Sequence, residues 1–275
     1  LLALVDGVAV RAGAQFAAAL GAEGRGGRLV GAAAGAGEPE RRAALAAESG
    51  SRRVLRAARG AGRRHPASLE SAIMPARAAG ICGLLAFVTV NLGWILGEVA
   101  QPGTYSPAND DISDLGALTA NSAWLYNQLG SNLTGALVVA LGLGLWRALS
   151  PDVLGRVGSL AVIVAGLGAF LDGIFRLDCR GIDASCTNDS WHSHVHKIES
   201  GITAGATLLA PLILAFAFRR IPAWRDSWVV SLATVPAVIL TNVVFSAIGD
   251  GAATRAGTVV VFLWIAFIGL RLVQG

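Results

Sequence analysis

Six apolar runs, each close to 20 residues long, follow one another through the chain after its first 77 residues. An α-helix rises about 1.5 Å per residue, so a run of this length crosses the roughly 30 Å hydrocarbon core of a bilayer. A transmembrane β-barrel would instead need alternating segments of about ten residues. Charged residues make up only 15% of the chain, against about 25% in soluble proteins. The sequence therefore predicts an all-α bundle of six transmembrane helices. The predicted spans are residues 78–99, 124–146, 157–175, 198–218, 228–248 and 256–273.

The basic charge of the chain lies in an arm that precedes these spans. Residues 1–73 hold 11 Arg and 6 acidic residues, whereas residues 74–275 hold 11 basic and 12 acidic residues. Ala, Gly and Arg dominate the arm, which has too few large apolar residues to offset its ordering entropy, so we expect disorder. Met74 is the only methionine, which favours a true start there and a non-native extension before it. An Arg-rich targeting peptide is the alternative. Arg content without a recognisable module predicts no nucleic-acid partner.

Arginines in the short loops predict the orientation of the bundle. By the positive-inside rule, loops rich in Arg and Lys face the cytoplasm. These arginines all fall on one side of the membrane. They lie before the first span, between the second and third spans, between the fourth and fifth, and at the end of the sixth. Both termini are therefore predicted to be cytoplasmic in a multi-pass protein of the cytoplasmic (inner) membrane. The arginines concerned are Arg77, Arg147, Arg156, Arg219, Arg220, Arg225 and Arg271.

Two cysteines give an independent sign of orientation. Cys179 and Cys186 share the loop between the third and fourth spans, which the arginines assign to the outside. Disulfides persist on the oxidising side of a membrane. We expect these two residues to form a disulfide, with metal ligation by the pair as the alternative.

Ionisable residues gather at the outer ends of the predicted spans. Glu98 ends the first span, Asp172 lies near the end of the third, His196 and Glu199 stand at the start of the fourth, and Asp250 follows the fifth. Charged groups within spans are costly and usually face a bundle interior or a water-filled cavity. Their common depth predicts one outward-facing polar cavity that collects them.

Helical spacing in the fourth span suggests a metal site. His192, His196 and Glu199 stand at positions i, i+4 and i+7, so they share one helix face if the helix extends back to residue 191. Two imidazoles and a carboxylate suit a divalent metal such as zinc, with Asp178 or Asp172 as a further oxygen ligand.

A simpler interpretation of the same residues needs no metal. The histidines then lie in an aqueous loop at a helix start and bond to the backbone or to acids, while Asp172 pairs with Arg176 at i+4. Ser113 or Ser190 with His192 could form the nucleophile and base of a serine hydrolase, but serine more commonly starts turns and caps helices. The sequence has no nucleophile elbow, phosphate loop, dinucleotide fingerprint or HExxH motif.

Two motifs carry a family resemblance. Residues 105–117 (YSPANDDISDLGA), and residues 173–178 (GIFRLD) followed by Trp191 and His196, resemble the family catalogued as domain of unknown function 998. The resemblance implies a prokaryotic membrane protein of about six spans, with no established activity. The Cys179 to Cys186 insert, His192 and His194 depart from the family pattern. The positions that match it are Ser113, Asp114, Gly116, Asp178 and His196.

Three functional hypotheses follow. The first is a non-enzymatic membrane protein that binds or conducts an ion, a small polar ligand or a lipid headgroup at the outer polar cluster. The second is a lipid hydrolase whose metal is held by His192, His196 and Asp178, with Glu199 or Asp172 as base. The third is a structural partner in a membrane complex. The candidate ligand-binding residues are Glu98, Ser113, Asp114, Asp172, Arg176, Asp178, His196, Glu199 and Asp250.

Overall fold

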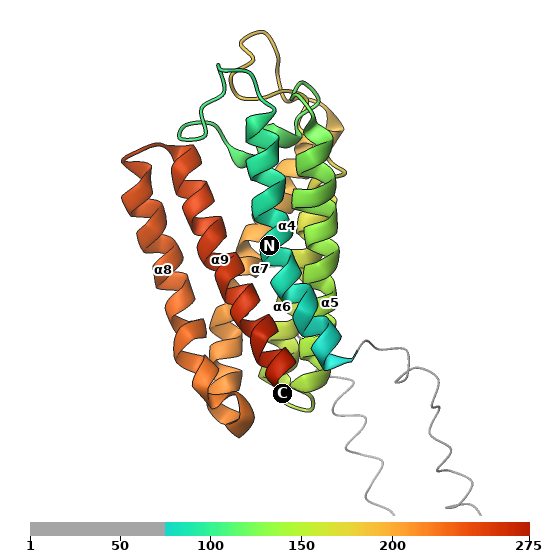
Figure 1. Ribbon diagram of the computed structural model, residues 1–275, viewed down its shortest axis with the longest axis vertical. Helices are drawn as coiled ribbons and strands as arrows, with labels where there is room; N and C mark the ends of the chain where they lie inside the picture. The colour runs from blue at the N-terminus through green and yellow to red at the C-terminus, as the bar shows by residue number, and fades with distance from the viewer. Residues whose placement is uncertain (1–74) are drawn as a thin grey trace, which may run out of the picture. The chain divides into compact units, whose positions relative to one another are not determined.

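The computed structural model describes residues 75–275, which form helices and loops and contain no strand. The predicted arm, residues 1–73, lies outside the described residues. Six helical segments are long and apolar enough to cross a membrane, which confirms the predicted six-span, all-α architecture (Figure 1). The helices are α4 (Ala76–Val99), η2 (Leu125–Leu133) continuing as α5 (Thr134–Ala148), α6 (Val153–Asp172), α7 (Trp191–Arg220), η3 (Pro222–Ser227) leading into α8 (Trp228–Ser246), and α9 (Asp250–Gln274).

Local signals set the helix boundaries. Asp152 caps α6 by accepting a hydrogen bond from the Gly155 backbone N–H at 2.7 Å, and Ser190 caps α7 in the same way from Ser193. Several predicted boundaries differ from the structure: the third span covers Val153–Asp172 rather than 157–175, the fourth begins at Trp191 rather than at residue 198, and the sixth begins at Asp250 rather than at residue 256. The early cap at Ser190 adds about two turns to α7 and brings the predicted histidines onto a helix.

Glycines allow neighbouring helices to approach at backbone distance. A Cβ placed on Gly93 of α4 would lie 2.3 Å from the Gly130 Cα of η2. A Cβ on Gly135 of α5 would lie 2.5 Å from the Gly166 carbonyl oxygen of α6. Small residues at such crossings are typical of membrane helices, whose association depends on close packing. The span around Gly130 is wound as a π-helix over Leu125–Leu133, a geometry that often marks functional sites.

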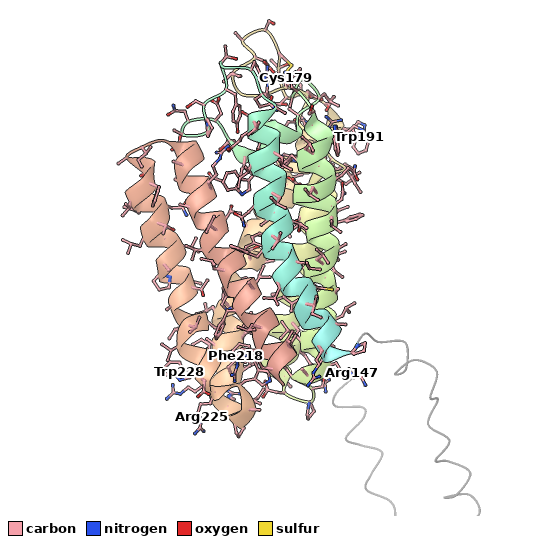
Figure 2. The ribbon with its side chains drawn as sticks, viewed as in Figure 1. Arg147, Cys179, Trp191, Phe218, Arg225 and Trp228 are labelled. Atoms are coloured by element: carbon pink, nitrogen blue, oxygen red, sulfur yellow. A yellow bond between two sulfur atoms is a disulfide. The ribbon has the colours of Figure 1, made fainter. Side chains whose placement is uncertain are left out.

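The bundle has two ends of different chemistry. We call the end formed by residues 100–124, 173–190 and 247–249 the disulfide end, and the opposite end, formed by residues 149–152 and 221–227, the arginine end. Figure 2 shows Cys179 and Trp191 at the disulfide end, and Arg147 and Arg225 at the arginine end. A core of large buried side chains lies on α5, α6, α7 and α9 and includes Leu145, Leu214, Phe218 and Ile268. Phe218 also stacks on Trp224 with ring centroids 4.9 Å apart.

Helix α8 lies at the edge of the bundle. Only 11% of its span is buried, against 33–50% for the other five spans. Its part nearest the disulfide end carries exposed large apolar side chains, including Leu240, Val243 and Val244. Figure 1 shows α8 beside α9 on the outside of the bundle. This half of α8 therefore leaves much of its surface for lipid.

Candidate functional site

Three ionisable side chains meet near the disulfide end of the bundle. Asp172 is the last residue of α6, and His196 and Glu199 lie one turn apart on α7. The His196 Nδ1 atom is 3.3 Å from Asp172 Oδ1 and 3.7 Å from Glu199 Oε1. His196 and Glu199 are buried, and Asp172 is half-buried. We call these three residues the acid–histidine cluster.

Hydroxyl groups complete the hydrogen bonding of the two carboxylates. Ser131 of η2 donates to Asp172 Oδ2 at 2.8 Å. Ser200 and Thr203 of α7 donate to the two carboxylate oxygens of Glu199 at 3.1 and 3.2 Å. Within residues 75–275, the ion pairs of Asp172 and Glu199 are with His196 and not with Lys or Arg. The two acids are therefore close together and share a single weak base.

The backbone fixes how His196 takes part in this cluster. Its Nδ1 atom lies 2.9 Å from the carbonyl oxygen of Phe175. Because a carbonyl oxygen only accepts, Nδ1 carries the proton in this bond, and the lone pair of a neutral ring is on Nε2. The Nδ1–H that faces the two carboxylates is thus engaged by the Phe175 carbonyl oxygen, which holds the ring in place beside them.

A cavity of about 430 Å³ lies against the acid–histidine cluster. This volume falls in the usual range of ligand sites, roughly 300–1,000 Å³. Asp172 and Glu199 both line it, together with Ser131, Thr203 and Tyr126. The remaining wall comes from α4, the loop before η2, and the facing sides of α8 and α9. The site therefore joins two carboxylates to a mostly apolar, partly open space.

A comparison with protein families adds an identification. A family model described as protein of unknown function (DUF998) matches residues 81–271. The chain belongs to this family. No curated protein and no solved structure matches it. Membership of the DUF998 family agrees with the resemblance carried by residues 105–117 and 173–178, and it supplies no reaction or ligand.

Two of the predicted ligand-binding acids of this DUF998 chain lie away from the acid–histidine cluster. Glu98 of α4 forms an ion pair with Arg255 of α9, which also donates to the hydroxyl oxygen of Tyr105 and to the Asp110 carbonyl oxygen. Asp250 is the exposed first residue of α9 and lies outside the cavity wall. Equal depth in the membrane did not bring Glu98 and Asp250 to the acid–histidine cluster, because Glu98 faces Arg255 and Asp250 faces outward.

Arg176 makes contacts other than the predicted pair with Asp172. Because α6 ends at Asp172, the i+4 spacing does not lie on one helix. The Arg176 guanidinium instead donates from Nε to the Gly116 carbonyl oxygen at 2.7 Å and from Nη2 to the Ala117 carbonyl oxygen at 2.9 Å. Arg176 therefore joins the loop of residues 173–190, called the second loop, to the loop of residues 100–124, called the first loop. Asp172 is left to the acid–histidine cluster.

The residues predicted as metal ligands are separated in the structure. The His192 ring packs on Trp191, with ring centroids 3.7 Å apart, while Asp178 accepts a hydrogen bond from the Ser190 backbone N–H at 2.9 Å. Bonds from Ser190 hold the pKa of the Asp178 carboxyl below its usual value. The potential metal-ligand group among the described residues is Asp172, His196 and Glu199, whose ligand atoms lie within 4.8 Å of one another.

In the motif of residues 105–117, one residue lines the cavity and others hold the loop in place. Ser113 lines the cavity, whereas Asp114 is buried and accepts a hydrogen bond from the Gly181 backbone N–H at 3.1 Å. A Cβ on Gly116 would lie 2.5 Å from the Asn127 side-chain oxygen, so this position favours glycine. The motif therefore positions one loop against the other and brings Ser113 to the cavity.

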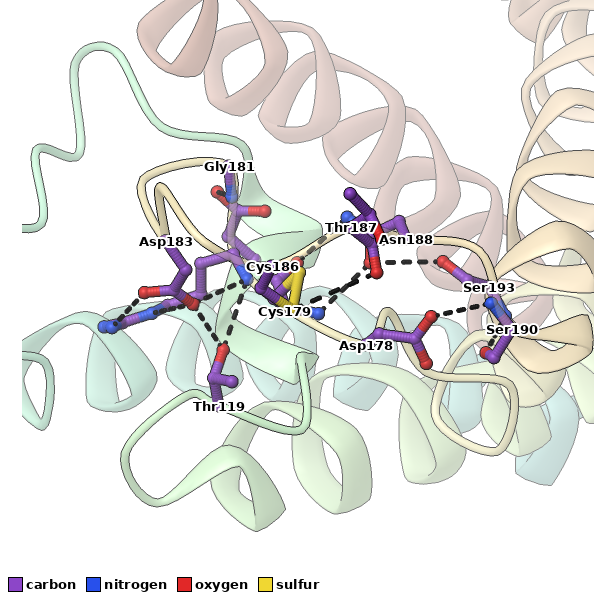
Figure 3. The surroundings of a disulfide bond; sticks show 12 residues. Thr119, Asp178, Cys179, Gly181, Asp183, Cys186, Thr187, Asn188, Ser190 and Ser193 are labelled. Atoms are coloured by element: carbon purple, nitrogen blue, oxygen red, sulfur yellow. Dashed lines mark hydrogen bonds and ion pairs between the residues drawn. A yellow bond between two sulfur atoms is a disulfide. The ribbon is translucent and has the colours of Figure 1, made fainter.

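The predicted disulfide is present and closes the second loop. Cys179 and Cys186 are bonded, with their Cα atoms 6.1 Å apart. Figure 3 shows Asn188 beside this bond, where its side chain accepts from the Cys179 N–H and donates to the Cys179 carbonyl oxygen. Thr119 of the first loop donates to Asp183 of the second. Hydrogen bonds to Arg180 and Thr119 lower the pKa of Asp183 to about 2.

Asp114 predicts a pH dependence of stability. Burial raises the pKa of its carboxyl from 3.8 to about 6, with the Gly181 N–H opposing the shift. The folded protein then binds more protons than the unfolded chain between about pH 4 and 6, so this contribution to stability falls as pH rises through that window. Asp114→Asn keeps an acceptor for Gly181 and removes the titration. Between pH 4 and 6.5, we expect the free energy of unfolding of the variant to rise relative to that of the parent by on the order of 1–3 kcal/mol. Thermal unfolding in detergent at several pH values measures this difference. Parallel pH curves for the two proteins would contradict the prediction.

Sequence reasoning missed the hydroxyl residues of the site. Ser131 and Thr203 contact the two carboxylates, but isolated Ser and Thr in an apolar run commonly bond to their own helix. One signal was available for Thr203, which stands four residues after Glu199 and so faces the same side of α7. Ser131 gave no such signal, because its orientation depends on the π-helical winding of η2.

Proposed function

We propose that this chain is a ligand-binding membrane protein, and that its cavity takes a molecule carrying a positively charged group that Asp172 and Glu199 recognise. The observation that supports this is the pair of carboxylates, both lining the 430 Å³ cavity, with His196 as their ion-pair partner among the described residues. A buried charge is costly unless it is paired. A cationic ligand would supply the missing counter-charge.

The electrostatic gain is large enough to select the ligand. A positive charge about 4 Å from one carboxylate gains about 4 kcal/mol at an effective dielectric constant of about 20. The hydroxyls of Ser131, Ser200 and Thr203 already donate to these oxygens and hold the carboxylates in place. A ligand with an anionic group would meet repulsion of similar size, so the sign of the charge is the main discriminator.

Co-purifying molecules test the proposal. The double variant Asp172→Asn/Glu199→Gln keeps the shape of the site and removes both charges. We expect mass spectrometry of protein purified in an uncharged detergent to find a cationic molecule with the parent, and at least about tenfold less with the variant, since 1.4 kcal/mol of lost binding gives that ratio. Asp250→Asn is the matched control, because Asp250 is exposed and does not line the cavity. Equal retention by parent and double variant would contradict the proposal.

A divalent cation is a second candidate occupant. It is supported by the potential ligand atoms of Asp172, His196 and Glu199, which lie within 4.8 Å of one another. Coordination through His196 Nδ1 would require this atom to give up its proton and its hydrogen bond to the Phe175 carbonyl oxygen. A metal held there next to the cavity would favour the lipid hydrolase among the earlier hypotheses, since bound metal activates water. The same purified proteins distinguish the two occupants. Stoichiometric zinc in the parent and its loss in His196→Ala would support the metal, and an organic cation without metal would support the first proposal.

We also propose that the disulfide end faces the outside of a prokaryotic cytoplasmic membrane, with both termini in the cytoplasm. The Cys179–Cys186 bond and the arginines at the other end support this orientation. A cysteine introduced at exposed Asn109 should react in intact cells with a maleimide that does not cross membranes, and one at exposed Arg225 should react only after lysis. The reverse pattern would overturn the orientation.

A further inference from the structure

The cavity changes from polar to apolar along its length. On α7, its wall begins with Glu199, Ser200 and Thr203 near the disulfide end and continues to Leu208. Nine residues of helix span about 13 Å, so the cavity extends from the end of the bundle toward the middle of a roughly 30 Å hydrocarbon core.

The facing helices repeat this gradient. On α9, the wall begins with Thr254 and Thr258 and ends with Val261 and Phe262. On α8, Asn242 lies nearer the disulfide end and Val238 lies deeper. All three helices thus place polar groups at the outer part of the cavity, and at its inner part they place apolar groups, with the Thr207 hydroxyl of α7 as the exception. A ligand that fits both parts has a polar head and an apolar chain.

The cavity also reaches the lipid-facing surface of the bundle. Ala204 of α7 lines the cavity and is itself exposed, about one and a half turns inward from the start of the wall at Glu199. On the same stretch of helix, Gly201 and Gly205 have no atom within 4 Å of an added Cβ. The neighbouring half of α8 is exposed as well. At this depth the surrounding medium is the hydrocarbon of the membrane, so a ligand has a sideways path beside α7.

The charge of the wall selects the head of such a ligand. Asp111, Asp172 and Glu199 are its acidic residues, and the described residues that line it include no Lys or Arg. Arg255, which follows the lining residue Thr254, is bonded to Glu98 and to backbone carbonyls. A phosphate or carboxylate head would have no basic partner here, whereas an ammonium head has two carboxylates.

We propose that the ligand is an amphiphile with one apolar chain and an ammonium head, taken sideways from the membrane leaflet on the side of the disulfide end. This inference rests on the proposed function and adds the chain to it. The ammonium lies between Asp172 and Glu199, and the chain extends past Ala204 toward Leu208 and Phe262.

Three probes separate the head from the chain. The full chain is purified in dodecyl maltoside and labelled with dodecylamine that carries a diazirine at the end of its chain. Unmodified dodecylamine, butylamine and dodecanol then compete for labelling. We expect cross-links on α7, α8 and α9 near Leu208, Val238 and Phe262, with dodecylamine the strongest competitor. Competition by dodecanol as strong as that by dodecylamine would show that the head contributes nothing and would overturn the proposal.

Variants of the cavity wall test the position of the chain. Ala204→Phe fills the space beside α7, and Leu209→Phe is the matched control, because Leu209 is exposed and does not line the cavity. We expect Ala204→Phe to weaken dodecylamine binding about tenfold, because the added ring takes space that the chain would fill, and to leave butylamine binding unchanged. Leu209→Phe should change neither. If Ala204→Phe does not fold, Thr207→Leu replaces it in the same test, because Thr207 also lines the cavity.

The outcomes distinguish this inference from the proposed function. If butylamine binding depends on Asp172 and Glu199 while Ala204→Phe affects both amines equally or neither, the chain does not occupy the cavity, and only the present inference fails. If neither amine responds to Asp172→Asn/Glu199→Gln, the proposed function fails as well. Cross-links confined to helix faces outside the cavity would also overturn the inference.

Discussion

Replacing Arg255 with methionine is expected to lower the free energy of unfolding by about 3–5 kcal/mol, because it leaves the largely desolvated carboxylate of Glu98 without its partner. Arg255 is 7% exposed and forms the ion pair with Glu98. It also donates to the Asp110 carbonyl oxygen at 2.9 Å and to the Tyr105 hydroxyl. Thermal unfolding in detergent measures the loss, which would be seen as a lower melting temperature.

The double variant Glu98→Gln/Arg255→Met is the control for this prediction. Removing both charges avoids the unpaired carboxylate, so we expect the double variant to be more stable than Arg255→Met alone, as in other buried pairs. The stability that the double variant still loses relative to the parent measures the contribution of the hydrogen bond from Arg255 to the Asp110 carbonyl oxygen. If the single and double variants lost the same stability, the ion pair itself would not be the stabilising feature.

Replacing Gly93 with alanine is expected to destabilise the bundle by at least about 1–3 kcal/mol, the usual cost of overpacking. The added Cβ would lie 2.3 Å from the Gly130 Cα and 2.4 Å from the Gly130 nitrogen. These are backbone atoms, so no side chain can turn away, and α4 must separate from η2. The same separation would move Ser131, which neighbours Gly130, away from Asp172. We therefore expect ligand retention to fall together with the melting temperature.

Gly205→Ala is the matched control for the steric argument. It makes the same chemical change on another membrane helix, where no atom lies within 4 Å of the added Cβ. Alanine is also the better helix former, so the melting temperature should stay the same or rise slightly. A loss in Gly205→Ala equal to that in Gly93→Ala would show that the close contact between α4 and η2 is not the cause.

The sequence predicted the helices of this protein well and their ends less well. Apolar runs fix the spans, because each backbone amide in lipid must bond within its own helix. The predicted end of the third span passed Asp172 by three residues, since the apolar Ile174 and Phe175 prolonged the run into the loop. The predicted start of the fourth came seven residues late. The polar turn at the start of α7 looks like a loop in hydropathy, and only the Ser190 cap marks it as helix.

The candidate site was predictable in depth but not in its partners. The sequence placed Glu98, Asp172, His196, Glu199 and Asp250 near one end of the bundle, and the structure gave them three different environments. A helix turns through 3.6 residues per turn, so position along the chain fixes the height of a side chain, while the neighbouring helix decides what it contacts.

The apolar runs and the cysteine pair by themselves determined six membrane-spanning helices, and they identified the two residues of the disulfide at one end. Those features depend on interactions of each segment with lipid or with a residue seven positions away. The tertiary structure alone decided that Arg255 pairs with Glu98, that Ser131 reaches Asp172, and that a cavity opens beside α7. Each of these depends on how helices distant in sequence rotate and pack against one another, which glycine contacts such as Gly93 with Gly130 fix at backbone distance.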